Sequence, residues 1–232
     1  MMKGMMVAVC AFAAASAFAE FSSVDVSFAR GKWNREDWTV VKGPRWDYCH
    51  GFVQKDGWIE NETPEGMSPE EVAKKCHSTT YSGMVWKEKF SIGTTVSTTT
   101  GWDWQMAPLI VIAPDLGVSK DGKLPEFREH WEIVVYYRGL NVWHHYWTPE
   151  RGPYWIKAAS MLLPQDANWK PNARHTLSVR VQKNAKGRKE MVCTCNGYTL
   201  QYMDDTLPDS FYGGILGCEG RNFFYDFKVS EK

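Results

Sequence analysis

The chain has 232 residues, and its 27 basic and 27 acidic side chains give a formal net charge of zero at pH 7. This balance argues against function classes that depend on a strongly charged surface, such as nonspecific binding to nucleic acid or to an anionic membrane. Aromatic residues make up 14% of the sequence, including 12 Trp, and such a composition is compatible with binding a neutral partner.

The N-terminal segment 1–19 has the pattern of a signal peptide. A single Lys precedes an apolar run, and Ala17 and Ala19 are the small residues that signal peptidase needs, so we expect cleavage before Glu20. The run is at the short end for a membrane span and no basic stop-transfer cluster follows it. The residue before Cys10 is larger than a lipoprotein signal requires. We therefore expect a secreted or periplasmic protein with no membrane span in its mature form.

Short strands separated by turns are predicted throughout residues 20–232, which we expect to form one domain. Alternating or continuous apolar patterns predict strands within residues 23–28, 51–61, 84–92, 107–114, 175–182, 190–202, 211–218 and 222–229. Hairpin turns are expected at Lys55-Asp56-Gly57 and at Asn196-Gly197. Residues 107–114 form a continuous apolar run, typical of a strand that is buried on both faces.

One helix is predicted, in an insertion between strands. Ser68 is its expected N-cap, Pro69 its first residue and Glu71 the partner of Ser68 in a capping box. Many short strands with so little helix predict an all-β sandwich or barrel. We expect five side chains to point between two packed antiparallel sheets: Ile133, Val135, Leu177, Val179 and Val181.

The two ends of the domain resemble the concanavalin A-like lectin/glucanase superfamily. The resemblance lies in the opening segment 36–61 and in the closing motifs Leu177–Val181, Asn196-Gly197, Asp204-Asp205, Gly213–Gly217 and Tyr225-Asp226-Phe227. Within the superfamily the chain looks most similar to uncharacterised secreted bacterial sandwiches of the DUF1961 type or the 3-keto-disaccharide hydrolase type. The resemblance implies a two-sheet antiparallel jelly roll whose concave sheet handles carbohydrate. A fold does not determine a function, which depends on the residues of the site.

Aromatic and polar residues crowd a predicted hairpin with arms 130–138 and 141–147 and a two-residue tip at Gly139-Leu140. One face carries Glu132, Val134, Tyr136, Arg138, Asn141, Trp143, His145 and Trp147, and the other carries Trp131, Ile133, Val135, Tyr137, Val142, His144 and Tyr146. The second face suits a core. The first suits a glycan, because aromatic rings meet the C–H faces of sugars and planar polar groups meet their hydroxyls. A three-residue tip would change the position of the histidines, and the same aromatics would also suit a core.

Further candidates lie outside this hairpin. Trp102 and Trp104 are two residues apart and could form a rim platform for a sugar, or could pack onto the edge of a sheet. Lys157 shares a strand face with Trp155 and could extend the binding face.

The carboxylate pattern of the retaining glucanases of this superfamily is absent. Those enzymes carry Glu-x-Asp-x-x-Glu on one strand, whereas Glu132 is followed by three apolar residues. The lyases of the same fold use Tyr or His to move protons, so Glu132, Tyr136 and His145 are the catalytic candidates, with Arg138 and Lys157 available to neutralise a uronate.

Three functions remain open. The first is a carbohydrate-binding or carbohydrate-processing accessory domain, whose partner is a polysaccharide or an oligosaccharide. The second is a polysaccharide lyase or glycoside hydrolase that uses Tyr, His and Glu as acids and bases. The third is a structural surface protein with no glycan ligand.

We expect no cofactor. Paired Cys-x-x-Cys units are absent, so structural zinc is not expected. Sandwiches of the kind that the resemblance implies sometimes carry a structural calcium, and Asp25 and Asp226 are conceivable ligands for it. An oxidising compartment permits disulfides, and the candidate pairs are Cys49 with Cys76 and Cys195 with Cys218. The alternative is a set of buried thiols.

Overall fold

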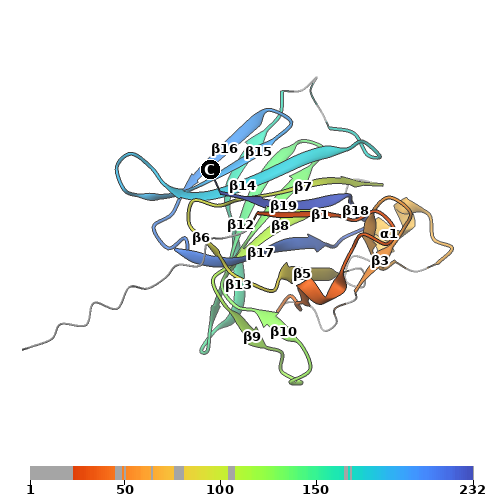
Figure 1. Cartoon of the computed structure of the whole chain (residues 1–232), viewed down its shortest axis with the longest axis horizontal. Coiled ribbons are helices and arrows are strands. Elements are labelled where there is room, and N and C mark those ends of the chain that lie inside the picture. Colours follow the sequence, from red (N-terminus) through yellow and green to blue (C-terminus); the bar gives the residue numbers. More distant parts are fainter. Residues whose placement is uncertain are drawn as a thin grey trace, which may run out of the picture.

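A computed structural model describes residues 23–231, except residues 45–48, 50, 64, 76–80, 104–107, 165–166 and 168. Two large antiparallel sheets dominate the described part (Figure 1). The first has the strand order β16-β15-β14-β7-β18-β4-β3, with β19 pairing to both β7 and β1. The second has the order β13-β12-β11-β8-β17-β5-β2, with β6 beside β17. The predicted all-β sandwich with one short helical insertion is confirmed.

The nine-stranded sheet comprises β1 (Val24–Ser27), β3 (Phe52–Gln54), β4 (Ile59–Asn61), β7 (Thr95–Trp102), β14 (His175–Lys183), β15 (Lys189–Cys195), β16 (Tyr198–Met203), β18 (Asn222–Phe224) and β19 (Asp226–Ser230). The eight-stranded sheet comprises β2 (Trp38–Val40), β5 (Ser82–Trp86), β6 (Phe90–Ser91), β8 (Leu109–Ala113), β11 (His130–Tyr136), β12 (Gly139–Thr148), β13 (Gly152–Leu162) and β17 (Ser210–Gly217). A separate hairpin pairs β9 (Leu116–Val118) with β10 (Pro125–Phe127). The helices are α1 (Pro69–Lys75) and a 3-10 turn at Arg35–Asp37.

Local signals in the sequence match the observed turns and caps. At the N-terminus of α1 the Ser68 hydroxyl accepts a hydrogen bond from the Glu71 amide at 3.2 Å, and the Glu71 carboxylate accepts one from the Ser68 amide at 3.1 Å. This is the predicted capping box. The Asn196-Gly197 turn joins β15 to β16, and both of its residues have positive φ, as a tight hairpin of this kind requires.

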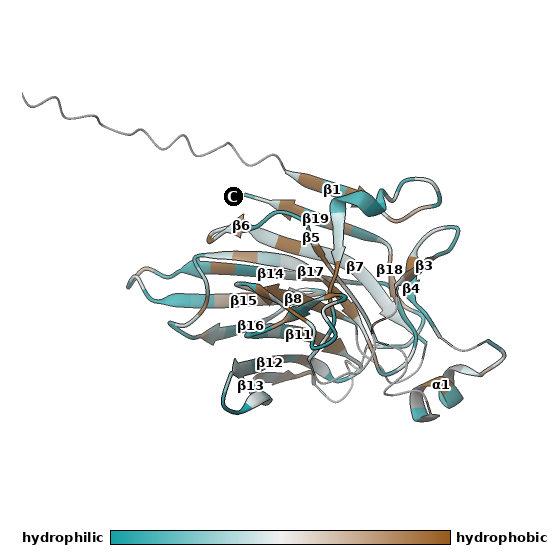
Figure 2. Ribbon diagram, turned by 90° about the horizontal axis from the view of Figure 1, so that it is seen from below, coloured by the Kyte–Doolittle hydropathy of each residue, from teal (hydrophilic) through white to brown (hydrophobic). Residues whose placement is uncertain are grey.

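The main core lies between the two sheets. The five side chains predicted for it all belong to this cluster and are at most 1% exposed. β8 is buried on both faces, as its continuous apolar run predicts. Ile110 and Ile112 point into the main core, whereas Val111 faces the other way, and Figure 2 shows β8 and β17 as apolar strands in the interior.

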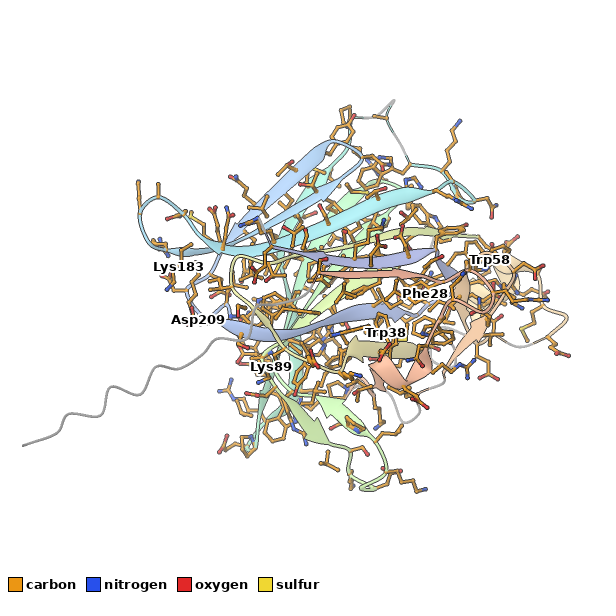
Figure 3. The ribbon with its side chains drawn as sticks, viewed as in Figure 1. Phe28, Trp38, Trp58, Lys89, Lys183 and Asp209 are labelled. Atoms are coloured by element: carbon orange, nitrogen blue, oxygen red, sulfur yellow. The ribbon has the colours of Figure 1, made fainter. Side chains whose placement is uncertain are left out.

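Aromatic packing also joins the sheets near their edges. The ring of Trp38 on β2 lies 5.8 Å from the ring of Phe28, which follows β1 (Figure 3). It also lies 4.9 Å from the ring of Phe227 on β19. Because these strands belong to different sheets, the three rings hold that side of the sandwich closed.

A second apolar cluster covers part of the outer face of the eight-stranded sheet, the face that points away from the main core. Val111 and Val134 on the sheet pack with Val41, Tyr81 and Phe127, which lie outside it. The cover includes the β9–β10 hairpin, which projects from the body of the sandwich in Figure 1. These residues therefore cover the centre of the outer face, whereas aromatic and polar side chains lie on the outer face of β12 and β13.

One of the two predicted disulfides is not observed. Cys195 carries a free thiol in the main core, whereas Cys218 belongs to the outer cluster, so a Cys195–Cys218 disulfide is wrong. The eight-stranded sheet lies between them, because Cys195 is in the core on its inner side and Cys218 is in the cluster on its outer face. The Cys49 thiol donates a hydrogen bond to the Val41 carbonyl at 3.4 Å, and its expected partner Cys76 lies outside the described residues.

The predicted leader also lies outside the described residues. Within the described ranges, no helix has both the length and the apolar character needed to cross a bilayer.

Candidate functional site

The crowded hairpin is formed by β11 and β12, but its tip is Tyr137-Arg138 rather than Gly139-Leu140. Tyr136 pairs with Gly139, and the register then brings His130 opposite His145. The predicted tip was wrong, because the observed tip lies two residues earlier in the chain. Because this shift is even, the predicted division of side chains between the two faces is observed all the same.

The inner face of the hairpin belongs to the core. Trp131, Ile133 and Val142 are fully buried there. His144 stacks on Trp131 with ring centroids 4.3 Å apart, and its Nε2 lies 2.8 Å from a Glu129 carboxylate oxygen. This histidine serves the packing between the sheets and does not reach the outer face.

On the outer face, three polar side chains converge. Glu132 Oε2 lies 3.0 Å from His145 Nε2, and Glu132 Oε1 lies 3.6 Å from His130 Nε2. The three residues are between 1% and 6% exposed. They meet because strand alternation puts His130 and Glu132 on one face and the register adds His145 diagonally across from Glu132. We call this group the His-Glu-His cluster.

The protonation of the cluster follows from its burial and its neighbours. Burial alone would raise the pKa of Glu132, but the two imidazoles outweigh it and hold that pKa well below its ordinary value. Burial lowers the pKa of His130, against the opposing effect of the nearby carboxylate. At neutral pH Glu132 is therefore a carboxylate and His130 a neutral imidazole.

Four rings lie one on another across the cluster, from the interior to the surface. Phe127 stacks on His130 with centroids 4.8 Å apart, His130 on His145 at 4.4 Å, and His145 on Trp155 at 6.0 Å. Phe127 is fully buried, whereas Trp155 on β13 is 42% exposed. The stack connects the buried cluster to a flat aromatic surface in solvent.

Basic side chains lie beside the other outer-face tryptophans. The exposed Lys157 on β13 pairs with Trp143 across the strands, and its Nζ lies 5.9 Å from the Trp143 ring. The Arg128 guanidinium lies 4.4 Å from the ring of Trp147, where it covers one face of that ring. Trp143 and Trp147 are therefore only half-exposed, and Trp155 offers the more open ring.

Residues of the β9–β10 hairpin hold the Arg128 side chain in place. Its Nη1 donates to a Glu126 carboxylate oxygen at 2.5 Å and its Nη2 donates to the Val118 carbonyl at 2.8 Å, while Lys42 reaches the other Glu126 oxygen at 3.3 Å. These bonds fix the wall of the site next to Trp147.

The remaining predicted residues of the hairpin lie farther along the same face. Tyr136 is four positions from Glu132 on β11, roughly 13 Å away at the rise of a strand. The exposed Arg138 is in the tip, and Asn141 accepts a hydrogen bond from the Ser160 hydroxyl at 2.8 Å. Tyr136, Arg138 and Asn141 therefore do not join Glu132 and His145 in one cluster.

Trp102 is not at a rim. It is fully buried in the main core at the end of β7, where its ring stacks on His175 at 4.7 Å. The expected platform at this residue is wrong, because β7 lies in the middle of the nine-stranded sheet and turns this ring toward the facing sheet. Trp104 lies outside the described residues.

The two carboxylates considered for calcium have protein partners. Asp226 accepts hydrogen bonds from the Thr99 amide at 2.5 Å and from its hydroxyl at 2.9 Å. Asp25 lies 3.4 Å from the amino group of Lys228. Both groups thus contribute to strand contacts of the nine-stranded sheet.

The sequence interpretation did not select two residues of this site: Trp155, which it named only as sharing a strand face with Lys157, and His130. The signal for His130 was present, since His130-x-Glu132 places an imidazole and a carboxylate on one face of any strand. The reason to single it out, its position opposite His145, depends on the register.

No family model matches the sequence, and a comparison with curated proteins gives no match. Solved structures do match. A carbohydrate-binding module, CBM66 from Bacillus subtilis, aligns with a TM-score of 0.52 at 10% identity over 84% of this chain and 96% of the module. The fold is a two-sheet antiparallel jelly roll like that of this module.

Two structures of glycan-degrading enzymes align similarly. One comes from a study of endo-acting O-glycanases that members of the human gut microbiota express to initiate mucin breakdown. It aligns with a TM-score of 0.59 at 11% identity, over 90% of this chain and 98% of that chain. The other is β-agarase A from Zobellia galactanivorans, with a TM-score of 0.54 at 8% identity over 90% of each chain. At these identities the likeness concerns the fold alone.

Proposed function

We propose that the protein is an exported carbohydrate-binding or carbohydrate-processing domain, and that it holds a glycan on the outer face of the eight-stranded sheet over Trp155. The single observation that carries this proposal is the ring stack, which ends in an exposed indole beside Lys157. A sugar ring can lie flat on the indole, while the ammonium group and the half-exposed Trp143 meet its hydroxyls and C–H edges. Structures of the same fold include a carbohydrate-binding module and two glycan-degrading enzymes, which supports the choice of partner.

Glycan cleavage is the second candidate, and the Glu132–His145 contact favours it. A carboxylate with a depressed pKa, 3.0 Å from an imidazole, can orient that imidazole and stabilise its charged form during proton transfer. Tyr136 lies too far along β11 to act at the same bond. The ionic partners of Glu132 among the described residues are imidazoles, so the paired carboxylates of common glycosidases are not the chemistry that this cluster offers.

A glycan panel decides between these candidates. Neutral and uronate-containing polysaccharides are assayed for retention of the protein and for new reducing or unsaturated ends. Retention without product supports a binding domain, and product that disappears in His145→Ala supports an enzyme. If the protein neither binds nor cleaves any member, and Trp155→Ala behaves as wild type throughout, the proposal fails and a structural role takes its place.

A further inference from the structure

We infer that His130, Glu132 and His145 form a binding site for one divalent transition-metal ion of the Zn²⁺ class, a site that goes beyond glycan binding over Trp155. The starting observation is convergence. The potential ligand atoms of the three residues all lie within 4.8 Å of one another, and all three residues are buried. Two imidazoles with one carboxylate are a common donor set for such ions.

The distances suit a metal between the groups. Ligands about 2.0–2.1 Å from a tetrahedral Zn²⁺ are roughly 3.3 Å from one another. Glu132 Oε2 and His145 Nε2 are 3.0 Å apart, and Glu132 Oε1 and His130 Nε2 are 3.6 Å apart. Each separation is close to the edge of such a tetrahedron. The two contacts use different Glu132 oxygens, so side-chain rotations would be needed to bring one oxygen and both nitrogens around a single ion.

The orientation of His130 is the one that a metal ligand needs. Its Nδ1 lies 2.8 Å from the backbone carbonyl of Arg128, which can only accept a hydrogen bond, so the proton is on Nδ1. In the neutral ring the lone pair is then on Nε2 and faces the Glu132 carboxylate. Two electron-rich groups that face each other in a buried site need a positive charge between them. A backbone carbonyl behind the ring is also the usual second contact of a metal-binding histidine.

His145 supplies an independent observation. Its Nε2 is buried and has no hydrogen-bond partner, because the nearby Glu132 oxygen, although only 3.0 Å away, is not aligned to accept a proton from it. A buried polar atom rarely lacks a partner in a protein interior. A metal ion between this nitrogen and the carboxylate would satisfy both.

The donor set also selects among ions. Ca²⁺ and Mg²⁺ prefer oxygen ligands, so the imidazoles disfavour them, whereas Zn²⁺, Co²⁺, Ni²⁺ and Mn²⁺ accept such a set. Three protein ligands leave a coordination position for water or another oxygen ligand.

The competing interpretation is a direct ion pair between a protonated His145 and Glu132. It would neutralise the carboxylate without metal, but it would leave His130 Nε2 facing the same carboxylate and His145 Nε2 without an aligned acceptor. Metal binding by the full chain separates the two interpretations.

The experiment measures metal stoichiometry in tag-free protein that has been stripped with chelator and titrated with ZnCl₂, CoCl₂ or CaCl₂. We expect one Zn²⁺ per chain, a thermal unfolding midpoint that rises on addition of Zn²⁺, and a visible absorption band with Co²⁺. Glu132→Gln preserves the shape of the side chain and should weaken Zn²⁺ binding at least tenfold, as should His145→Ala. His144→Ala is the matched control, because this neighbour faces the core, and it should retain one Zn²⁺ per chain.

Two outcomes would overturn the inference. One is a wild-type protein that binds no Zn²⁺ or binds only Ca²⁺. The other is Zn²⁺ binding that persists unchanged in folded Glu132→Gln, since the ion would then be elsewhere. If His145→Ala does not fold, Glu132→Gln and the wild-type Co²⁺ spectrum still decide. Trp155→Ala keeps all three ligands and should retain the ion even if glycan binding is lost, so failure of the metal site and failure of the glycan proposal are distinguishable.

Discussion

Replacing Trp155 with Ala tests the proposed glycan surface most directly. The side chain is 42% exposed, and a Trp that is fully covered buries on the order of 150–250 Å², so about 60–105 Å² remains for a ligand. A sugar ring that covers half of this area would remove about 30–50 Å² from water, or about 1 kcal/mol at ~25 cal/mol per Å². That loss corresponds to about a fivefold increase in Kd.

Ile156→Ala is the matched control for this change. Ile156 is the next residue on β13 and is 48% exposed, but it pairs with His144 and so lies on the opposite face of the strand. Titration calorimetry with a glycan retained by the wild type should show the weakened Kd in Trp155→Ala only, with unchanged circular dichroism in both variants. An unaltered Kd in Trp155→Ala, or an equal loss in Ile156→Ala, would refute the assignment of the outer face.

Three further predictions concern stability, measured by urea unfolding. Trp102→Ala removes a fully buried ring from the core and should lower the free energy of unfolding by about 3–5 kcal/mol. Gly139→Ala should cost about 1–3 kcal/mol or more, because φ there is +146° and an added Cβ would lie 1.9 Å from the Met161 carbonyl oxygen of β13. Asp204→Asn should lower stability at pH 7 more than at pH 3. Burial raises the pKa of Asp204, but hydrogen bonds from Thr206 and Tyr202 outweigh it and depress that pKa. The Asp204 carboxylate therefore stabilises the folded protein above about pH 4, and this stabilisation is lost as the pH falls through the folded-state pKa.

The controls for these variants come from open positions. Leu162→Ala, at a side chain that is 62% exposed, should change stability by no more than about 0.5 kcal/mol. A Cβ at Gly57 would meet nothing within 4 Å, so Gly57→Ala should be tolerated. A Trp102→Ala variant as stable as Leu162→Ala would contradict the core placement. Wild-type stability in Gly139→Ala would contradict the strand geometry at that residue, and an equal loss at pH 3 and pH 7 in Asp204→Asn would contradict the depressed pKa.

The sequence by itself determined most of the strands, the two clearest hairpin turns and the capped helix, but it did not predict β7 or the β9–β10 hairpin. These depend on neighbours within a few residues, as with the Ser68–Glu71 capping box and the Asn196-Gly197 turn. It also determined which side chains share a face of each strand, because alternation does not depend on the partner strand. The outer-face set that includes Glu132 and His145 was predictable for that reason, even with the tip misplaced by two residues.

Only the tertiary structure decided which of these residues meet. Pairing His130 with His145 requires the register of β11 on β12, which is set jointly by the turn and by the packing of both faces. The burial of Trp102 depends on the position of β7 inside its sheet, and the separation of Cys195 from Cys218 depends on which face of which sheet each one reaches. Contacts between distant segments carry no local pattern, so the ring stack and the His-Glu-His cluster arise from the arrangement of strands rather than from any motif along the chain.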